Sequence, residues 1–513
     1  MTTHDLMTRE QRGSQPGLGG LRNCCVVLIC AACLLAVDAA RAEWRLSLEH
    51  TELWAEGQAT AVNDLCAGDV DGDGVMEVLS LATTRSSGIE HAELRVVRWV
   101  DRVFEVIGKQ RWTVDDARTL GRAIACTDID GDGRLEILTG TVRDPREGPS
   151  RTELRIWHWD ADTAGLIVDT GHVLDALSLR ALAVGDLGAD GAAKILIGGS
   201  SHNGAELRIL NMRRGELVEA QGLHWRVSGA IGTVYGIGVA DLDDDGQREV
   251  AAASTAAGTI DLRIWSWGGD GLTPEAERQW RVFDQSAVTA LAIGRLDADR
   301  RPDIAVVGSA RDGDAEDPMF GLIGIWQWDG SDLELRREHT WQSRRGNVEL
   351  FAAAAIDIAD HPRQLVVGGA IHEAPAWNLM RVYKWDGWRL EASHSEAWVA
   401  PTMAQGFLYA LHAADLGADA SLELVTAGRA VDAGHRDHHA LDIWSVTWSR
   451  PSPGLDRLRE ILGFEGWPFY AALRDALPMP WPPLVYGLML AVVLGAGLRA
   501  VWRLLSRGYG SSG

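Results

Sequence analysis

Residues 126–141 read CTDIDGDGRLEILTGT, in which three aspartates alternate just before an aliphatic run. Asp128, Asp130 and Asp132 occupy every second position, Gly133 follows them, and Glu136 comes three residues later. Carboxylates crowded in this way repel one another unless a cation lies between them, and such oxygen-rich loops are typical of calcium sites. The rest of the chain decides whether this cation serves a function or only stiffens the fold.

The same pattern returns six more times. Two further copies keep every acid, CAGDVDGDGVMEVLSLA from Cys66 and VADLDDDGQREVAAAS from Val239. Four copies are weaker, and the first loop positions of all seven are Asp69, Asp128, Asp186, Asp241, Arg295, Asp357 and Asp415. Successive copies lie 54 to 62 residues apart, and this regular period indicates a repeat architecture.

Each repeat contains four short segments of strand character. One aliphatic strand enters the acidic loop, a second leaves it, and a third carries a motif such as LRIWHW. The fourth strand is expected to open on a tryptophan, namely Trp112, Trp225, Trp280, Trp341 or Trp398. Four strands per unit with aromatic marks are typical of β-propellers. The sequence therefore predicts an all-β, seven-bladed β-propeller, in which an N-terminal strand from Trp44 closes the last blade.

These repeats resemble the FG-GAP family, also called VCBS-type and known from the N-terminal propeller of integrin α chains. The shared motif is a D-x-D-x-D-G-x-x-D/E loop before an aliphatic strand ending on small residues, such as GGS at 198–200 or GGA at 368–370. The resemblance covers about residues 44–448 and implies that the ninth loop position supplies the closing ligand. This chain departs from the family because the phenylalanine–glycine pair is missing and four of the seven loops are eroded.

We expect structural Ca²⁺ at about three sites, the loops that keep every acid. The expected ligands are Asp69, Asp71, Asp73, Glu77, Asp128, Asp130, Asp132, Glu136, Asp241, Asp243, Asp245 and Glu249. The alternative is an Asx-type turn that needs no metal. In the third loop Lys194 at the ninth position could replace the ion, in the fifth Arg295 and Arg300 oppose one, and the sixth and seventh have lost key residues.

Both ends of the chain predict a membrane-anchored protein. The expected parts are a signal peptide at 1–42, the propeller at 43–449, a proline-containing stalk with a short amphipathic helix at 450–480, a transmembrane helix at 481–505 and a cytoplasmic tail at 506–513. Arginines after the apolar span leave the tail inside, so the propeller is predicted outside the cytoplasm, in a bacterial periplasm or at a cell surface. The alternatives are an uncleaved N-terminal anchor and, at the other end, a buried amphipathic helix.

Cysteine usage gives little support for a disulfide framework. Four of the six cysteines lie in the predicted signal segment, which leaves Cys66 and Cys126 in the mature chain. These two could pair, but the interpretation favoured from the sequence is two buried thiols on neighbouring strands.

The function predicted from the sequence is binding. The net charge of −23 argues against nucleic acid as a partner. We find no motif for catalysis or for a cofactor other than Ca²⁺, so we expect no catalytic residues and no enzymatic activity. A protein or glycan is expected to bind the face opposite the metal loops, where the candidate contacts are Arg146, Tyr235, Phe320, Phe351, His372, Trp377, Tyr409 and His435. The alternatives are a propeller hydrolase or lyase acting on polysaccharide or phosphodiester, and an architectural subunit of an envelope complex.

Overall fold

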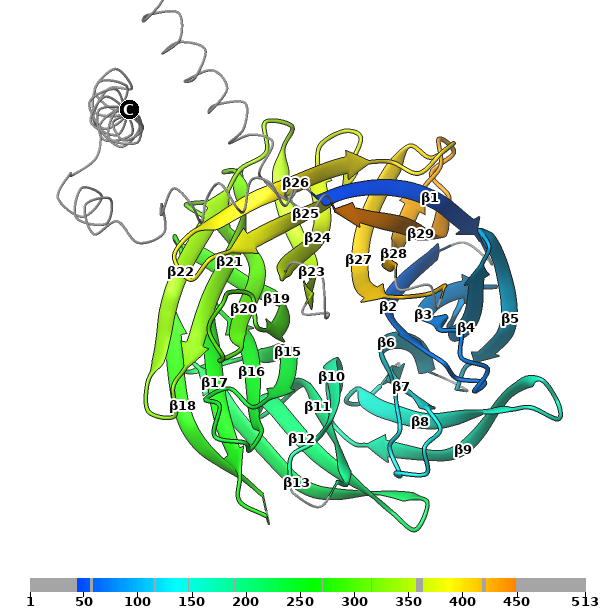
Figure 1. Ribbon diagram of the computed structural model, residues 1–513, viewed down its shortest axis with the longest axis horizontal. Coiled ribbons are helices and arrows are strands. Elements are labelled where there is room, and N and C mark those ends of the chain that lie inside the picture. The colour runs from blue at the N-terminus through cyan, green and yellow to red at the C-terminus, as the bar shows by residue number, and fades with distance from the viewer. Residues whose placement is uncertain are drawn as a thin grey trace, which may run out of the picture. The chain divides into compact units, whose positions relative to one another are not determined.

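Seven antiparallel sheets are arranged as blades around a central channel in the computed structural model (Figure 1). The structure describes residues 44–448 except 56–58, 115–116, 146, 189–190, 270, 315, 357–362 and 418–420. Among the residues described, none forms a helix long and apolar enough to cross a membrane. The predicted signal segment and the predicted stalk, span and tail lie outside these residues.

The blades follow one another in chain order, and each runs from an inner strand at the channel to an outer strand at the rim. The first two blades contain β2 (Ala59–Gly68), β3 (Glu77–Ser86), β4 (Ile89–Val100) and β5 (Val103–Trp112), then β6 (Ala117–Thr127), β7 (Glu136–Pro145), β8 (Arg151–Asp160) and β9 (Gly165–Leu174). The third contains β10 (Ser178–Asp186), β11 (Ala193–Ser201), β12 (Gly204–Arg213), β13 (Glu216–Val227) and the short β14 (Ala230–Ile231). The fourth contains β15 (Thr233–Ala240), β16 (Glu249–Ala256), β17 (Thr259–Trp267) and β18 (Leu272–Trp280).

The remaining blades repeat this order. The fifth contains β19 (Gln285–Gly294), β20 (Asp303–Arg311), β21 (Met319–Trp328) and β22 (Leu333–Trp341), and the sixth contains β23 (Asn347–Ile356), β24 (Gln364–His372), β25 (Trp377–Trp385) and β26 (Leu390–Trp398). The seventh contains β27 (Gln405–Ala414), β28 (Leu422–Val431) and β29 (Asp437–Trp448), completed by β1 (Trp44–Trp54).

Strand β1 closes the ring, as the sequence predicted. It pairs antiparallel with β29 over its whole length, from Trp44 opposite Trp448 to Trp54 opposite His439. Figure 1 shows this N-terminal strand beside the last strands of the chain. This pairing covers the outer edge of β29, to which another strand could otherwise add.

Burial within a blade falls from the middle strands to the rim. In β3 six successive residues from Glu77 are buried, because this strand lies between the sheets of its neighbours. The outer strand β5 is mostly exposed until its last residue, Trp112. The alternation of exposed and half-buried residues in the outer strands is what a one-sided strand requires.

The tryptophans end the fourth strands, which corrects the prediction that they open them. Trp112, Trp280 and Trp398 are the last residues of β5, β18 and β26. A tight turn returns the chain directly after the third strand, so the fourth strand starts about nine residues earlier than the aromatic mark suggested. The corresponding residue of β1 is Trp54 and not Trp44, and Leu174 takes this place in β9.

Each of these tryptophans packs across a blade boundary. The pairs Trp112–Trp157, Trp225–Trp265, Trp280–Trp326, Trp341–Tyr383 and Trp398–Trp444 have ring centroids 5.1, 5.4, 4.6, 5.8 and 4.7 Å apart. Four third strands add an arginine over the tryptophan of the preceding blade, at 4.1 to 5.0 Å from the ring centroid for Arg95, Arg155, Arg263 and Arg381. Aromatic area and cation–π attraction together hold neighbouring blades in register.

Two of these boundaries form a matched pair that differs in the hydrogen bonding of the indole N–H. Trp225 donates its indole N–H to the fully buried Asp261 at 2.8 Å and to Ser254 at 3.3 Å, whereas the indole N–H of Trp112 is buried without an acceptor. We therefore expect Trp225→Phe to lower the free energy of unfolding by about 1.5–3 kcal/mol more than Trp112→Phe, because only the first loses a bond to a charged group. Urea unfolding followed by tryptophan fluorescence measures both, and equal losses would contradict the assignment.

Candidate functional site

The three complete acidic loops fold around their own backbone. Each joins the inner strand of a blade to the second strand, in the first, second and fourth blades. The first aspartate accepts backbone N–H groups from within the turn: Asp69 accepts from Gly72 at 2.8 Å and from Gly74 at 2.9 Å. Gly74 has a φ of 91°, so glycine is needed there for the turn to close.

The closing glutamates are the first residues of β3, β7 and β16, and all three are buried. Glu77, Glu136 and Glu249 accept the N–H of Val70, Ile129 and Leu242, at 3.1, 2.7 and 2.8 Å. Burial raises the pKa of Glu77 and Glu249 to about 7 and also raises the pKa of Glu136, with nearby aspartates contributing. These carboxylates are therefore costly to ionise without a positive charge beside them.

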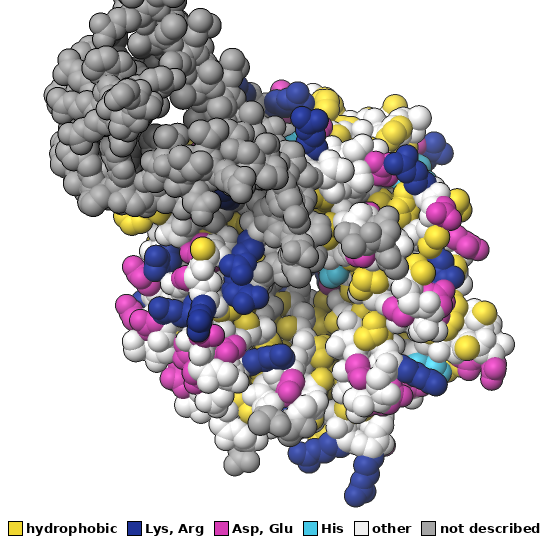
Figure 2. Space-filling model, viewed as in Figure 1, with side chains coloured by type: hydrophobic (Ala, Val, Ile, Leu, Met, Phe, Trp, Pro, Cys, Tyr) yellow, Lys and Arg dark blue, Asp and Glu magenta, His cyan; other side chains and the backbone are white. Residues whose placement is uncertain are grey.

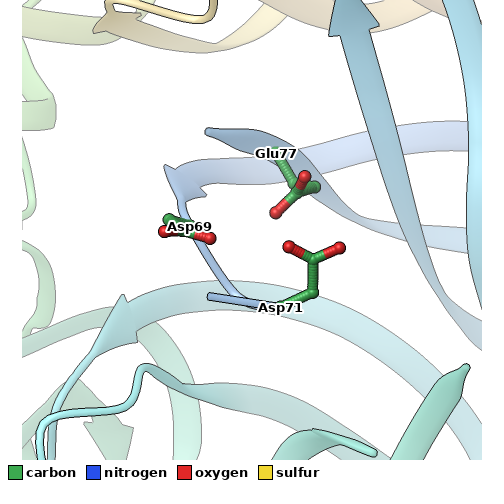
Figure 3. Close-up of side chains that lie close together, drawn as sticks. All are labelled: Asp69, Asp71 and Glu77. Atoms are coloured by element: carbon green, nitrogen blue, oxygen red, sulfur yellow. The ribbon is translucent and has the colours of Figure 1, made fainter. Parts of the chain in front are cut away.

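Three of the four predicted ligands of each loop come together. In the groups Asp69–Asp71–Glu77, Asp128–Asp130–Glu136 and Asp241–Asp243–Glu249, one oxygen of each residue lies within 4.8 Å of the others, so the three clusters could hold a metal ion. Figure 3 shows the carboxylates of Asp71 and Glu77 facing one another with Asp69 beside them. The third aspartates are not members of these groups. Asp73, Asp132 and Asp245 each accept the N–H two residues further on, at 2.9, 2.8 and 2.7 Å.

The loops of the second and fourth blades fit Ca²⁺. Among the described residues, no basic side chain forms an ion pair with Asp128, Asp130 or Glu136, nor with the matching acids of the fourth blade. The nearest third-strand side chains are engaged elsewhere: His158 pairs with Asp169 at 2.6 Å and Ser266 donates to Glu275 at 2.6 Å. Oxygen ligands alone, with no internal counter-charge, are the donor set of a hard cation.

The first blade differs because it supplies its own cation. Arg98 of β4 stands opposite Glu77 in the sheet register and forms ion pairs with Glu77 and Asp73, both at 3.0 Å, and with Asp71. A metal ion at this cluster would have to displace the guanidinium from those carboxylates. The sequence motif alone did not reveal this competitor, because Arg98 lies 21 residues after Glu77.

The eroded loops keep part of the architecture, but their described residues form no such cluster. In the fifth and seventh blades, Asp303 and Glu423 still accept a backbone N–H from the loop, at 3.2 and 3.0 Å. In the third blade the buried Lys194 takes the place of the closing acid and donates to the Ala192 carbonyl at 2.9 Å. The hydrogen bond from the loop to the closing acid therefore also forms in loops whose described residues make no metal cluster, so it stabilises the turn by itself.

The central channel is hollowed into a cavity of about 700 Å³ lined by the inner strands of all seven blades. Every inner strand carries a β-bulge at the same level, where one residue is skipped in the pairing with the second strand. The seven skipped residues, which we call the bulge ring, are Asn63, Arg122, Arg180, Tyr235, Thr289, Phe351 and Tyr409. All seven line the cavity, as expected when bulges redirect side chains.

Two members of the bulge ring are tied to the next blade. The Asn63 amide donates to the Gly121 carbonyl at 2.9 Å, and the Thr289 hydroxyl donates to the Leu350 carbonyl at 2.6 Å. The other five side chains, two arginines and three aromatic rings, are left to face the cavity. Phe351 and Tyr409 pack edge to face, with centroids 5.1 Å apart.

The cavity lies on the face predicted for binding. Its wall includes Glu90, Arg429 and Asp437, which flank the loops between second and third strands, and antiparallel pairing places these loops opposite the metal loops. Three predicted contact residues, Tyr235, Phe351 and Tyr409, line the cavity.

The other predicted contacts lie elsewhere. Phe320 packs on Phe283, Trp377 lies under Arg345, and His372 pairs with Glu349 at 2.6 Å. His435 is exposed in the loop between β28 and β29, and Arg146 falls outside the described residues.

Cys66 and Cys126 form a disulfide, which corrects the prediction of two free thiols. They lie on β2 and β6, the inner strands of neighbouring blades, with Cα atoms 6.0 Å apart. This separation falls within the usual range for a disulfide. The sequence placed the cysteines on adjacent strands, but only the blade-to-blade geometry shows that they meet.

The fold and the channel define a seven-bladed β-propeller with a polar and aromatic central cavity. No family model and no curated protein matches the chain, so the resemblance to the FG-GAP family remains a prediction. Solved structures that match include the core factor of S. cerevisiae (10% identity, TM-score 0.44, 92% of this chain and 70% of that one). They also include the exotype rhamnogalacturonan lyase YesX (11% identity, TM-score 0.32, 77% and 91%) and a rhamnogalacturonan lyase of Bacillus licheniformis (12% identity, TM-score 0.34, 76% and 91%).

The prediction from the sequence that this chain is not an enzyme is wrong against these matches, because two of the matching structures are named as rhamnogalacturonan lyases. At TM-scores below 0.5, these likenesses supply neither a reaction nor a substrate for this chain.

Proposed function

We propose that this protein is a membrane-anchored, calcium-stabilised propeller outside the cytoplasm that binds a glycan in its central cavity. The cavity belongs to the face opposite the metal loops, so the ions and the ligand would bind at separate sites. The ions would hold the blade corners, while the ligand would contact side chains from several blades. The sequence also favoured a protein as ligand, and failure to bind any glycan in the experiment below would favour that partner class instead.

The observation that carries the proposal is the bulge ring. Seven bulges at one level direct two arginines and three aromatic rings into a concave site, and its volume of about 700 Å³ suits a small ligand better than a flat protein surface. Tyr235, Phe351 and Tyr409 offer aromatic faces, against which the apolar faces of sugar rings can pack. Variable side chains on a rigid scaffold are the usual setting of recognition.

Two further observations support the location. A disulfide between Cys66 and Cys126 suits an oxidising compartment outside the cytoplasm. The uncharged stretch from Leu484 to Leu498, followed by arginines, has the composition of a membrane anchor.

Glycan-array binding by the full-length protein in detergent tests this proposal. We expect selective binding to a subset of glycans, and loss of at least about tenfold in affinity for Phe351→Ala/Tyr409→Ala, because each removes a buried aromatic contact. The matched control is Trp388→Ala, since Trp388 is 71% exposed on the turn after β25. Comparing glycan lengths before and after incubation reports any cleavage. A protein that captures no glycan, or a double variant that binds normally, would overturn the proposal.

A further inference from the structure

Two arginines of the bulge ring stand side by side around the channel. Arg122 is the bulged residue of β6 and Arg180 that of β10, and these are the inner strands of the second and third blades. Both side chains line the central cavity. No other neighbouring blades place two residues of like charge in the bulge ring.

Neither arginine is in direct contact with an acid among the described residues, although Asp144 and Glu90 attract Arg122 from farther away. No hydrogen bond or ion pair within that part of the chain involves either guanidinium, and the Nε of Arg122 is buried without an acceptor. Burial, followed by repulsion from Arg180 and Arg118, lowers the pKa of Arg122 to about 10. A buried donor without an acceptor costs free energy until a ligand supplies one.

Each acid of the cavity wall makes its direct contacts with groups other than these two arginines, and Glu90 attracts Arg122 only from farther away. Asp64 accepts the N–H groups of Leu65 and Ile124, both at 2.9 Å.

The other two acids of the wall form ion pairs with other arginines. Glu90 pairs with Arg85 at 2.8 Å and with Arg118, and Asp437 pairs with Arg429 at 2.5 Å. Although the whole chain carries a net charge of −23, the cavity therefore contains two arginines that form no ion pair with a described residue.

Figure 2 shows both acidic and basic side chains on the face in view. The pair Arg122 and Arg180 differs from these surface charges because both side chains line the central cavity.

We propose that the bulge ring binds an acidic saccharide, with its carboxylate or sulfate between Arg122 and Arg180 and its ring against Phe351 and Tyr409. Planar guanidinium groups bind oxyanions with two parallel hydrogen bonds, which gives geometric selectivity as well as attraction. Blade order places Phe351 across the channel from the arginine pair, so one ligand can meet both. This inference rests on the proposed function and names its ligand class.

The experiment is a glycan array carrying uronate-containing, sulfated and neutral oligosaccharides, probed with the full-length protein. We expect the bound glycans to be acidic, and Arg122→Gln/Arg180→Gln to weaken their binding by about 10- to 100-fold for each arginine removed. Arg122→Lys/Arg180→Lys keeps the positive charge but loses the planar guanidinium with its paired donors, so we expect a loss of affinity between those of wild type and the double glutamine variant. The uronate and sulfate arms identify which oxyanion is bound.

The control is Arg102→Gln, because Arg102 has a side chain that is 78% exposed on the turn between β4 and β5. Unfolding temperatures of all variants, compared with wild type, show whether the fold is kept. Selective binding of neutral glycans, or unchanged binding by the double glutamine variant, would overturn this inference while leaving glycan binding in place. Absence of any glycan binding would overturn both proposals.

Discussion

Replacing both cysteines of the Cys66–Cys126 bridge with serine should lower the free energy of unfolding by about 4 kcal/mol. The bridge spans 60 residues, and closing a loop of that length restricts the unfolded chain by about this amount in the chain-entropy model. The disulfide also joins two neighbouring inner strands, so its loss frees one blade boundary near the channel.

Urea unfolding of the full-length protein, with and without reductant, measures this effect. Reductant should shift the wild-type midpoint to that of Cys66→Ser/Cys126→Ser and leave the variant unchanged. Alkylation of the unfolded, unreduced wild type supplies an independent check, because paired cysteines do not react. If both residues are alkylated there, the pairing is wrong.

The architecture could be read from the sequence because the repeat expresses it seven times. One acidic loop is ambiguous, but seven first positions at a regular period, each followed by an aliphatic strand, leave few folds to consider. The closing role of β1 also followed from counting, since one outer strand was missing at the end of the chain. The boundaries of the fourth strands did not follow, because their exposed, mixed composition hides where the tight turn ends.

Only part of the proposed binding site could be predicted from the sequence. Each member of the bulge ring lies six residues before the first loop position of its repeat, from Asn63 before Asp69 to Tyr409 before Asp415. The aromatic members were predicted as channel contacts, whereas Arg122 and Arg180 were missed, because a polar residue inside a strand is ordinarily read as its solvent face. The bulge breaks the two-residue alternation on which that interpretation depends.

For the metal loops, the sequence predicted the acidic residues but not all of their contacts. The sequence identified the acids correctly as groups, yet it could not show that Arg98 reaches the first loop from a different strand. It also treated all four acids of a loop as equivalent, although the third aspartate is used by the turn. Both facts depend on side-chain direction in three dimensions and not on spacing along the chain.

Removal of Ca²⁺ should destabilise the propeller strongly at neutral pH. A ligand that binds only the folded state adds about 2.7 kcal/mol for each site when its free concentration is about 100 times its Kd. Two loops without an internal cation would therefore contribute about 5 kcal/mol, with a further part from the first blade if the ion displaces Arg98. Thermal unfolding of full-length protein in chelator, then with Ca²⁺ restored, measures this contribution.

The contributing loops can be separated by substitution. Asp128→Asn/Asp241→Asn should remove most of the calcium response, whereas Asp186→Asn should keep it, since Asp186 begins a loop whose described residues form no acidic cluster. Arg98→Gln should lower stability in chelator more than in Ca²⁺, because the ion can then replace the lost guanidinium. Unfolding temperatures that do not change on chelation would contradict a structural role for calcium.

The pH dependence of the calcium effect follows from the closing glutamates. Without an ion, burial raises the pKa of Glu77 and Glu249 to about 7 in the folded state, above the value of about 4.3 expected when unfolded. The folded state then binds more protons between these values, so the free energy of unfolding should fall as pH rises from about 4.5 to 7. Bound Ca²⁺ favours the ionised carboxylates, and the stability it adds should grow over the same interval. Equal calcium responses at pH 5 and pH 8 would show that these glutamates are not ligands.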